Sequence, residues 1–450
     1  MTDASAEAGA PQGELAGGAL WHTLRRVALP AVVANLLMTT FYNADTYWIG
    51  RTLGAEALAG ATAAVFWIWL VISMGEVVSI GLDAVAARRH GERRPAEAAR
   101  AASDGLVLAL AMGTAVALAA PWLLPGLFAV MHTGEGVSAI GRAYLGTYLM
   151  GTPLLFGFFA VDAVFRAKGD TRTPLQILGV TTVLALLLDP LLIRGAGPVP
   201  ALGVQGAALA TLVPRGIGCV VGVWLLHRRG LLTLASPRWE VMVAIARIGA
   251  PAAATGVAFS AIYVALTRIT TQFGTPALAA LGLGFRIESV VYVVSVGVGA
   301  AVAAIVGQSL GADDPDRARR AGWLGTLAVS AVGLLMAVVC LAIPEQLGAV
   351  FSDDPAVVAE AARYLKIAAF MQLFLGAEVV LESAMAGAGW TLIPMLGSTA
   401  ITALRLPVGA WAASQWGVTG LWVTLAVTSV GRGVLMMALW QSGRWRRSRV

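Results

Sequence analysis

Two aspartates stand inside apolar segments of this sequence, where their charge needs an explanation. Asp45 lies in "NADTYWIG", toward the end of an apolar run that begins near Val27, and Asp189 lies in "LLLDPLLIRG". Within a membrane span an ionisable side chain costs roughly 2.5–3.5 kcal/mol, so it usually faces the protein interior and has a role. A carboxylate in such a place is suited to taking up a proton or holding a metal cation. The rest of the chain decides whether these segments cross a membrane.

The composition is that of an integral membrane protein. Hydrophobic residues make up 58% of the 450 residues and charged residues 12%, whereas soluble domains contain about 45–50% and 25%. No interval between the apolar segments is long enough for a water-soluble catalytic domain, and no cluster of metal ligands or nucleophile with a matching base is present in the sequence, so an enzyme is not expected. An apolar helix of about 20 residues crosses a bilayer. The predicted fold class is an all-α membrane protein with twelve transmembrane helices, near 27–50, 56–82, 101–124, 138–162, 174–193, 201–226, 241–270, 276–305, 321–343, 356–384, 392–413 and 417–440.

The basic residues gather on one side of the predicted membrane. Because basic loops mark the cytoplasmic face, we expect both termini inside, in a multi-pass protein of the cell (inner) membrane. The net charge of +6 is explained by this asymmetry, so no nucleic-acid partner is expected. The opposite loops hold little beyond Arg51 and Arg194. The basic clusters lie at 25–26, 88–100, 166–172, 228–238, 317–320 and 444–449.

The two halves of the chain repeat each other. At an offset of 220, "HGERRPAEAAR" at 90 aligns with "LGADDPDRARR" at 310, "RAYL" at 142 with "ARYL" at 362, and "KGDTRTP" at 168 with "AGWTLIP" at 388. At an offset of 214, "GVQG" at 203 aligns with "GVTG" at 417. Each half holds six spans, so we expect two lobes related by an axis along the membrane normal, with the substrate site between them. The predicted parts are a disordered tail (1–22), an amino-terminal lobe (23–230), a carboxyl-terminal lobe (231–441) and a basic cytoplasmic tail (442–450).

The two aspartates are expected at the same depth. Arg51 follows Asp45 by six residues and Arg194 follows Asp189 by five, which places both carboxylates roughly 8 Å below the outer end of their helices. Pro190 is expected to bend the second helix beside its carboxylate. The repeat gives neither aspartate an acidic counterpart in the second half. The alternative is that the two carboxylates only pair with Arg51 and Arg194 at the interface.

Other acidic residues mark a candidate substrate cavity. Glu378 and Glu382 are four residues apart and therefore share a helix face. Glu288 in "GFRIES" stands two residues from Arg286, which is a possible partner. A negative cavity suits cationic substrates, and an aromatic ring such as that of Phe41 offers a further surface for cations. Purely structural pairing of these acids is the alternative.

Several segments resemble the multidrug and toxic compound extrusion family. They are "ALPAVVANLLMTTFYNADTYWIGRTLGAEALAG", "AKGDTRTP", "GFRIES", "VGQSLGADDPDRA", "MAGAGWTLIP" and "LRLPV". The resemblance covers essentially everything after the amino-terminal tail. The resemblance implies two six-helix lobes that export cationic or amphiphilic small molecules against an inward flow of protons or sodium. It also implies that Asp45, Asp189 and Thr211 form the ion-coupling site. We place Asn43 and Phe41 in the substrate cavity. One chain suffices for such a mechanism, in the lipid bilayer and without a cofactor.

The sequence departs from the family pattern at the fifth helix. The family often carries asparagine four residues before the aspartate, and this chain has Ala185 there. A sodium ion requires several oxygen ligands, so this loss favours protons and leaves sodium possible. The acidic pair in the first lobe resembles the DinF-like branch. Our hypothesis is that protonation from outside neutralises Asp45 and Asp189, bends the first helix near Asn43, and displaces substrate outward.

A flippase for a lipid or lipid-linked sugar is the alternative function, because it needs the same two lobes and a gated cavity. Such proteins often have a strongly cationic cavity for a pyrophosphate headgroup, whereas the interior acids found here favour cations. The sequence does not identify the transported compound.

Overall fold

The computed structural model describes residues 15, 17–131, 135–195, 200–233, 235–350 and 354–448, and all regular secondary structure in them is helical. The amino-terminal half contains α1 (Leu20–Leu53), α2 (Ala55–Gly91), α3 (Pro95–Met131), α4 (Glu135–Met150), α5 (Thr152–Lys168), α6 (Arg172–Arg194) and α7 (Gly203–Arg228). The carboxyl-terminal half contains α8 (Trp239–Thr270), η1 (Thr271–Phe273), α9 (Thr275–Gly311), α10 (Pro315–Ala342), α11 (Pro344–Ala349), α12 (Pro355–Gly387), α13 (Leu392–Ala403), α14 (Arg405–Gln441) and η2 (Arg444–Arg447).

Twelve spans are obtained once two breaks are taken into account. Ten helical stretches are long and apolar enough to cross a membrane, and the pair α4 and α5, bent by 52° at Gly151, makes an eleventh. The stretch Leu392–Gln441 has 50 residues, roughly 75 Å of helix, which is more than twice a bilayer core. It breaks at Trp416 and Gly417, whose backbone angles are non-helical, and therefore supplies two spans. The predicted fold class is confirmed.

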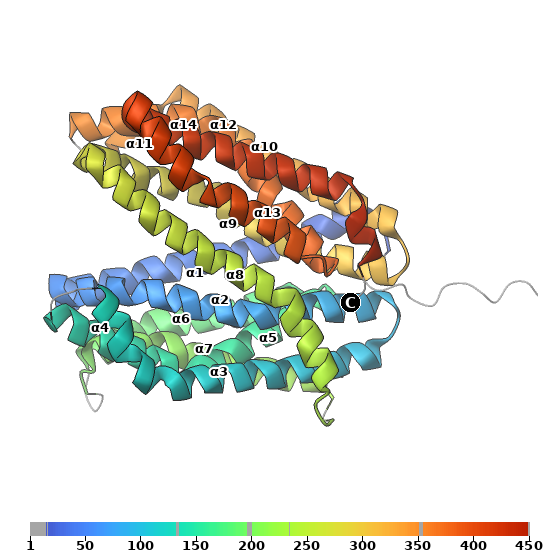
Figure 1. Ribbon diagram of the computed structural model, residues 1–450. Helices are drawn as coiled ribbons and strands as arrows, with labels where there is room; N and C mark the ends of the chain where they lie inside the picture. Colours follow the sequence, from blue (N-terminus) through green and yellow to red (C-terminus); the bar gives the residue numbers. More distant parts are fainter. Residues whose placement is uncertain are drawn as a thin grey trace, which may run out of the picture.

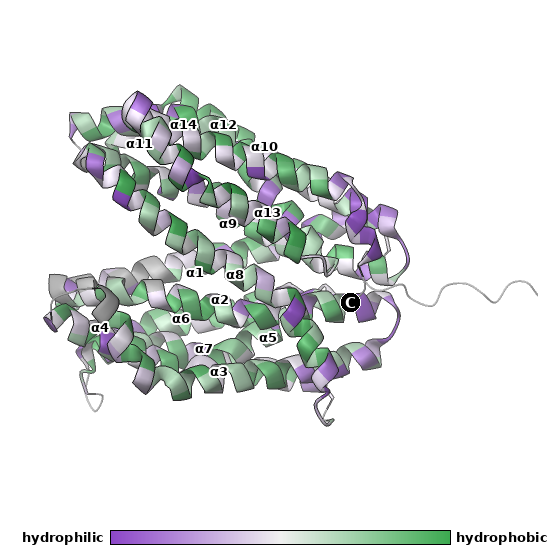
Figure 2. Ribbon diagram, viewed as in Figure 1, coloured by the Kyte–Doolittle hydropathy of each residue, from purple (hydrophilic) through white to green (hydrophobic). Residues whose placement is uncertain are grey.

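The helices form two lobes whose axes diverge from one end of the molecule toward the other (Figure 1). Helices α1–α7 make the amino-terminal lobe and α8–α14 the carboxyl-terminal lobe, each around its own apolar core. Hydrophobic residues run along the middle of the helices, and hydrophilic residues concentrate at the turns where the lobes meet (Figure 2). The first turns of each lobe's first helix pack into the apolar core of the other lobe. Val27 of α1 belongs to a core of the carboxyl-terminal lobe, and Ile248 of α8 belongs to the core of the amino-terminal lobe.

The repeat is visible as equivalent contacts. In the first lobe, the hydroxyl of Thr171 donates to the carbonyl of Val27 at 2.9 Å, and in the second the hydroxyl of Thr391 donates to the carbonyl of Ile248 at 2.9 Å. Each threonine follows a glycine with positive φ by two residues, Gly169 at 94° and Gly389 at 76°. The same contact therefore ties the first helix of each lobe to the turn between its fourth and fifth spans.

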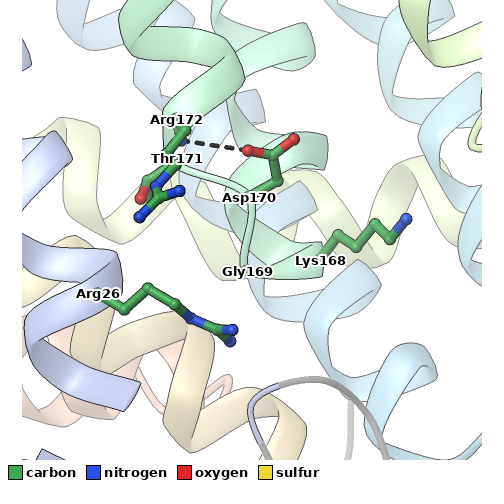
Figure 3. Close-up of a pocket in the computed structure, with 6 residues that line it drawn as sticks. All are labelled: Arg26, Lys168, Gly169, Asp170, Thr171 and Arg172. Atoms are coloured by element: carbon green, nitrogen blue, oxygen red, sulfur yellow. Dashed lines mark hydrogen bonds between the residues drawn. The ribbon is translucent and has the colours of Figure 1, made fainter. Parts of the chain in front are cut away.

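The turn between α5 and α6 is itself held by Asp170. One carboxylate oxygen accepts from the backbone nitrogens of Arg172 and Thr173, and the other accepts from Thr173 Oγ1 and Arg229. Figure 3 shows Arg26, Lys168 and Arg172 around this turn, where they line a pocket of about 230 Å³ with residues 169–171. The basic residues of three elements therefore meet here.

All predicted basic clusters in the described residues lie at one end of the molecule, which we call the basic end. It comprises the starts of α1 and α10, the α2–α3, α5–α6 and α9–α10 turns, the α7–α8 linker and η2, and it is linked by contacts such as Arg446 with Asp316 and Arg238 with Asp104. Helix η2, the last described element of the chain, also lies at this end (Figure 1).

The lobes cross at the basic end through two equivalent glycines. A Cβ on Gly91 of α2 would lie 2.0 Å from the carbonyl oxygen of Gln308, and a Cβ on Gly311 of α9 would lie 2.1 Å from that of Arg88. These four residues are paired by the offset of 220 found in the sequence. The backbones of α2 and α9 therefore touch at the symmetry axis, and only glycine permits that approach.

The observed boundaries differ from the predicted ones in two respects. Helix α1 starts at Leu20 and Leu15 is fully buried, so the tail predicted over 1–22 ends earlier. The disorder predicted for residues 1–14 and 16 falls outside the described residues. Helices α2 and α9 also continue to Gly91 and Gly311, because charged and polar turns remain helical after they leave the apolar layer.

Candidate functional site

The first lobe contains a buried acidic site made by Asp45 of α1 and Asp189 of α6. Asp189 is 0% exposed, and neither of its carboxylate oxygens has a hydrogen-bond partner. Asp45 is 7% exposed, accepts from the hydroxyl of Tyr144 at 3.3 Å, and keeps its other oxygen unpartnered. The two carboxylates are close enough for their charges to interact. In the described part of the chain neither forms an ion pair with Arg51 or Arg194, so simple pairing at the interface does not explain them.

The remaining members of the predicted coupling site come from α7 and α1. The hydroxyl of Thr211 is buried and donates to the carbonyl of Ala207 at 3.4 Å. Phe41 is buried, and the guanidinium of Arg215 stacks over its ring at 5.3 Å. The Phe41 ring is therefore already engaged by a cation of the protein. Asn43 lies within α1, but its side chain falls outside the described residues.

Arg215 is a site residue that the sequence interpretation missed. It lies one turn after Thr211 on α7, is 5% exposed, and its charge acts on Asp45. Tyr144, the donor to Asp45, was also missed, because α4 is far from α1 in sequence. An arginine within an apolar span was the available signal for Arg215.

The acidic site can bind a proton or a small cation. Three buried carboxylate oxygens without a hydrogen-bond partner are costly in the interior, since burial removes their water without replacing it. One nearby arginine cannot neutralise two carboxylates. Protonation of one carboxylate supplies the missing positive charge and turns an acceptor into a donor toward its neighbour.

In the second lobe each of the two buried glutamates has a cation or hydroxyl partner, unlike Asp189 of the first lobe. Glu288 of α9 accepts from the hydroxyl of Tyr364, and Glu378 of α12 forms an ion pair with Arg432 at 2.9 Å. Glu378 also accepts from the hydroxyl of Ser398 at 3.2 Å. Arg286, the predicted partner of Glu288, is exposed. Tyr364 is the repeat equivalent of Tyr144, so both lobes use the same tyrosine to hold a buried acid.

Arg405 lies beside Leu406 and Pro407, near which the repeat places the counterparts of Asp189 and Pro190. It is 1% exposed and donates to the hydroxyls of Thr428 at 2.8 Å and Ser429 at 2.6 Å. A third hydrogen bond goes to the hydroxyl of Tyr263. The interior is therefore less uniformly acidic than the acidic residues alone indicated, because Arg405 and Arg432 carry positive charge into the second lobe.

Glu382 and Glu76 form the exposed acidic part of the region between the lobes. Glu382 is one turn beyond Glu378 on α12 and partly exposed, and Glu76 lies midway along α2 and is exposed. Their charges, together with that of Glu378, act on the hydroxyl of Tyr292 on α9, so the two lobes present these groups to the same space. In the described part of the chain neither Glu76 nor Glu382 forms an ion pair. This pair of glutamates is suited to a positively charged ligand.

Removal of the Arg432 charge should destabilise the second lobe. Arg432→Met keeps an apolar stem but leaves the buried carboxylate of Glu378 with only Ser398 as a partner. Loss of one member of a buried ion pair costs about 3–5 kcal/mol. We expect a lower unfolding temperature in detergent by thermal denaturation with size-exclusion detection. The double change Arg432→Met with Glu378→Gln should recover most of the loss, and equal stability of the single variant and the wild type would contradict the assignment.

The comparisons with known proteins agree with this architecture. The MatE family profile matches residues 30–191 and 251–411, one match in each lobe. A protein of Deinococcus radiodurans described as a probable multidrug resistance protein NorM is 31% identical over 93% of this chain and 95% of its own length. A FAD transporter of Shewanella oneidensis is 27% identical over 91% of this chain and 92% of its own length.

Solved structures show the same fold. A MOP superfamily transporter from Pyrococcus furiosus, reported with a binding pocket of reverse polarity, has a TM-score of 0.88 at 18% identity and covers 98% of this chain and 99% of its own. The Vibrio cholerae MATE transporter VcmN in its bent form has a TM-score of 0.86 at 23% identity, with 94% and 96% covered. Because the profile covers more than half of the sequence and the fold agrees over nearly all of it, the chain belongs to the MatE family, the multidrug and toxic compound extrusion transporters.

Proposed function

We propose that this transporter exports cationic or amphiphilic small molecules by antiport with protons, with Asp45 and Asp189 as the coupling site. The observation that carries the proposal is Asp189, which is completely buried with both carboxylate oxygens unpartnered, next to the charge of Asp45. Such a site holds a proton readily and releases it when water or a cation reaches it. The chain uses no cofactor in this mechanism, and we propose no enzymatic activity.

Protons fit the site better than sodium. Sodium binding requires several oxygen ligands at once. Where the family often has asparagine, this chain has the buried Ala185, whose methyl group offers no oxygen. The hydroxyl of Thr211 is engaged with its own helix. The two carboxylates alone suffice for a proton. The acidic pair also supports the DinF-like branch as the position of this chain within the family.

The proposed orientation of the molecule in the membrane supports export from the cytoplasm. The basic end is assigned to the cytoplasmic face of the inner membrane because basic loops are retained there. The lobes meet at that end and diverge toward the other (Figure 1), which is the arrangement of a transporter that faces outward. Protons then reach Asp45 from outside, and rocking of the two lobes that separates α2 from α9 at the basic end exposes the space between the lobes to the cytoplasm.

The proposed substrate class rests on Glu76 and Glu382. These two carboxylates face the region between the lobes without an arginine partner in the described residues, whereas Arg405 and Arg432 are held by hydroxyls or by Glu378. A cationic or amphiphilic molecule gains charge pairing there and apolar contact with the surrounding helices. A lipid flippase remains the alternative, because the same two lobes also form the path such a protein needs.

The test is efflux of a fluorescent lipophilic cation from proteoliposomes that contain the purified protein. Separate proton and sodium gradients are applied, with an ionophore-collapsed gradient as the control. We expect transport with the proton gradient alone. Transport driven only by sodium would overturn the choice of ion. No efflux under either gradient, together with movement of a fluorescent lipid between leaflets, would replace the proposed function by the flippase.

A further inference from the structure

Leu15, Gly17 and Gly18, which we call the strap, contact both lobes at the basic end. Leu15 is 0% exposed although it precedes the first helix. Its side chain lies in the core of the second lobe and against Gly169 of the first, where a Cβ would lie 2.7 Å from Leu15 Cδ2. A residue outside any helix is buried between the lobes here, at the end where they meet.

Two side chains of the second lobe hold the backbone of the strap. Gln308 of α9 is 0% exposed, accepts from the backbone nitrogen of Leu15 at 3.0 Å, and donates to the carbonyl of Ala167 in the first lobe at 2.6 Å. Arg317 of α10 is 7% exposed and donates to the carbonyls of Leu15, Gly17 and Gly18 at 2.7–3.2 Å. A buried arginine whose charge is met by three backbone carbonyls is a built site, since an unpartnered guanidinium would be costly in this position.

The repeat shows what the strap corresponds to. In the other half, the linker before α8 is held on α3 by Ser103, which exchanges two hydrogen bonds with Thr233, and by Asp104, which binds Arg238. Helix α3 of the first lobe is the equivalent of α10 in the second. Each lobe therefore binds the segment that leads into the other lobe's first helix. The linker is covalently attached to both lobes, whereas the strap is covalently attached only to α1.

We propose that Gln308, Arg317 and Gly169 form a binding site for the chain's own strap, and that its occupancy holds the two lobes closed at the basic end. The ligand is an uncharged stretch of backbone with one apolar side chain at its start. Arg317 supplies charge-assisted hydrogen bonds, and Gly169 supplies the space for Leu15. Because the strap continues into α1 of the first lobe while Gln308 and Arg317 of the second lobe bind its backbone, the lobes cannot separate at this end while the strap stays bound. Release of the strap is a required step of the opening.

The experiment measures the separation of the lobes directly. Spin labels are placed at Arg172 in the first lobe and Arg320 in the second, both exposed at the basic end, in a full-length chain with Cys219 and Cys340 replaced by alanine. Double electron–electron resonance gives the distance distribution without any ion gradient, so the result does not depend on the proposed coupling. We expect the short distance to dominate in the parent chain. Arg317→Gln should raise the long-distance population roughly tenfold or more, since hydrogen bonds to charged groups are the strong ones.

Two matched controls and a second variant complete the test. Arg319→Gln removes the same charge two residues away, at a side chain that bonds Gln441 within its own lobe, and should leave the distribution unchanged. Leu15→Asp places a charge in the apolar site and should act like Arg317→Gln, whereas Leu15→Met should not. Leu15 precedes the helices, so this pair remains decisive if Arg317→Gln fails to fold. Distributions for Arg317→Gln or Leu15→Asp that overlay the parent would overturn the proposal.

Discussion

Asp45→Asn and Asp189→Asn are each expected to reduce proton-driven efflux to the level of empty liposomes while the protein still folds and inserts. The amide has nearly the shape of the carboxylate and still accepts the hydrogen bond from Tyr144 at position 45, but it cannot take up a proton. Removal of an unpartnered buried charge should leave stability unchanged or raise it. The measurement is efflux of a lipophilic cation under a proton gradient, with thermal unfolding of each purified variant.

The control is Asp313→Asn, which removes an exposed carboxylate in the α9–α10 turn and should transport like the parent. Tyr144→Phe provides a graded case, because it removes the hydrogen bond to Asp45 and leaves both carboxylates in place. It should alter the pH dependence of transport rather than abolish transport. Full proton-driven efflux by either asparagine variant would remove that aspartate from the coupling mechanism.

Gly91→Ala and Gly311→Ala are expected to prevent the lobes from closing at the basic end. The added methyl group would lie 2.0 or 2.1 Å from a backbone carbonyl oxygen of the opposite lobe, far inside the contact distance of about 3.5 Å. Neither backbone can move aside without separating α2 from α9. The spin-label pair at the basic end should therefore report a long distance in each variant, and outward export should be lost.

The matched control for this prediction is Gly282→Ala, which lies in the same helix as Gly311 and has nothing within 4 Å of the added Cβ. Alanine is favoured over glycine inside a helix by about 1 kcal/mol, so this control should be neutral or slightly stabilising. Opposite effects of Gly311→Ala and Gly282→Ala would therefore show that the loss comes from the contact between α2 and α9 and not from helix propensity. A short distance in Gly91→Ala would show that the two backbones do not seal this end.

The spans and the repeat could be predicted because their signals are local. A bilayer requires about 20 apolar residues, and the offset of 220 that aligned Gly91 with Gly311 is also the offset that relates their contacts in the structure. Both Asp45 and Asp189 are buried in the structure, and their equal depth in the membrane stays a prediction. Their role as a coupling site is still a prediction. The gap predicted between the last two spans, at 414–416, overlaps the observed break at Trp416 and Gly417.

The partners of the acids were harder to predict, because partnership depends on which helices pack together. Nothing near Asp45 in sequence indicates Tyr144, and nothing near Glu378 indicates Arg432, which is 54 residues later. The sequence interpretation weighed acidic residues within spans and passed over Arg215, Arg405 and Arg432. A search for basic as well as acidic residues within the spans would have found these arginines. It would not have shown which carboxylate each arginine contacts.

The two connections at the basic end differ in what happens under strain. The α7–α8 linker is continuous chain and can only stretch or bend, whereas the strap is attached at one side and can dissociate. Because the linker cannot dissociate and the strap can, the two lobes should separate at the basic end in a fixed order. The side of α1 and α10 comes apart first, and the side of α8 and α3 follows as a hinge. In a symmetric dimer of six-helix halves the two connections would be identical, and neither would open first. Joining the halves into one polypeptide makes the connections different and so sets the order in which they open.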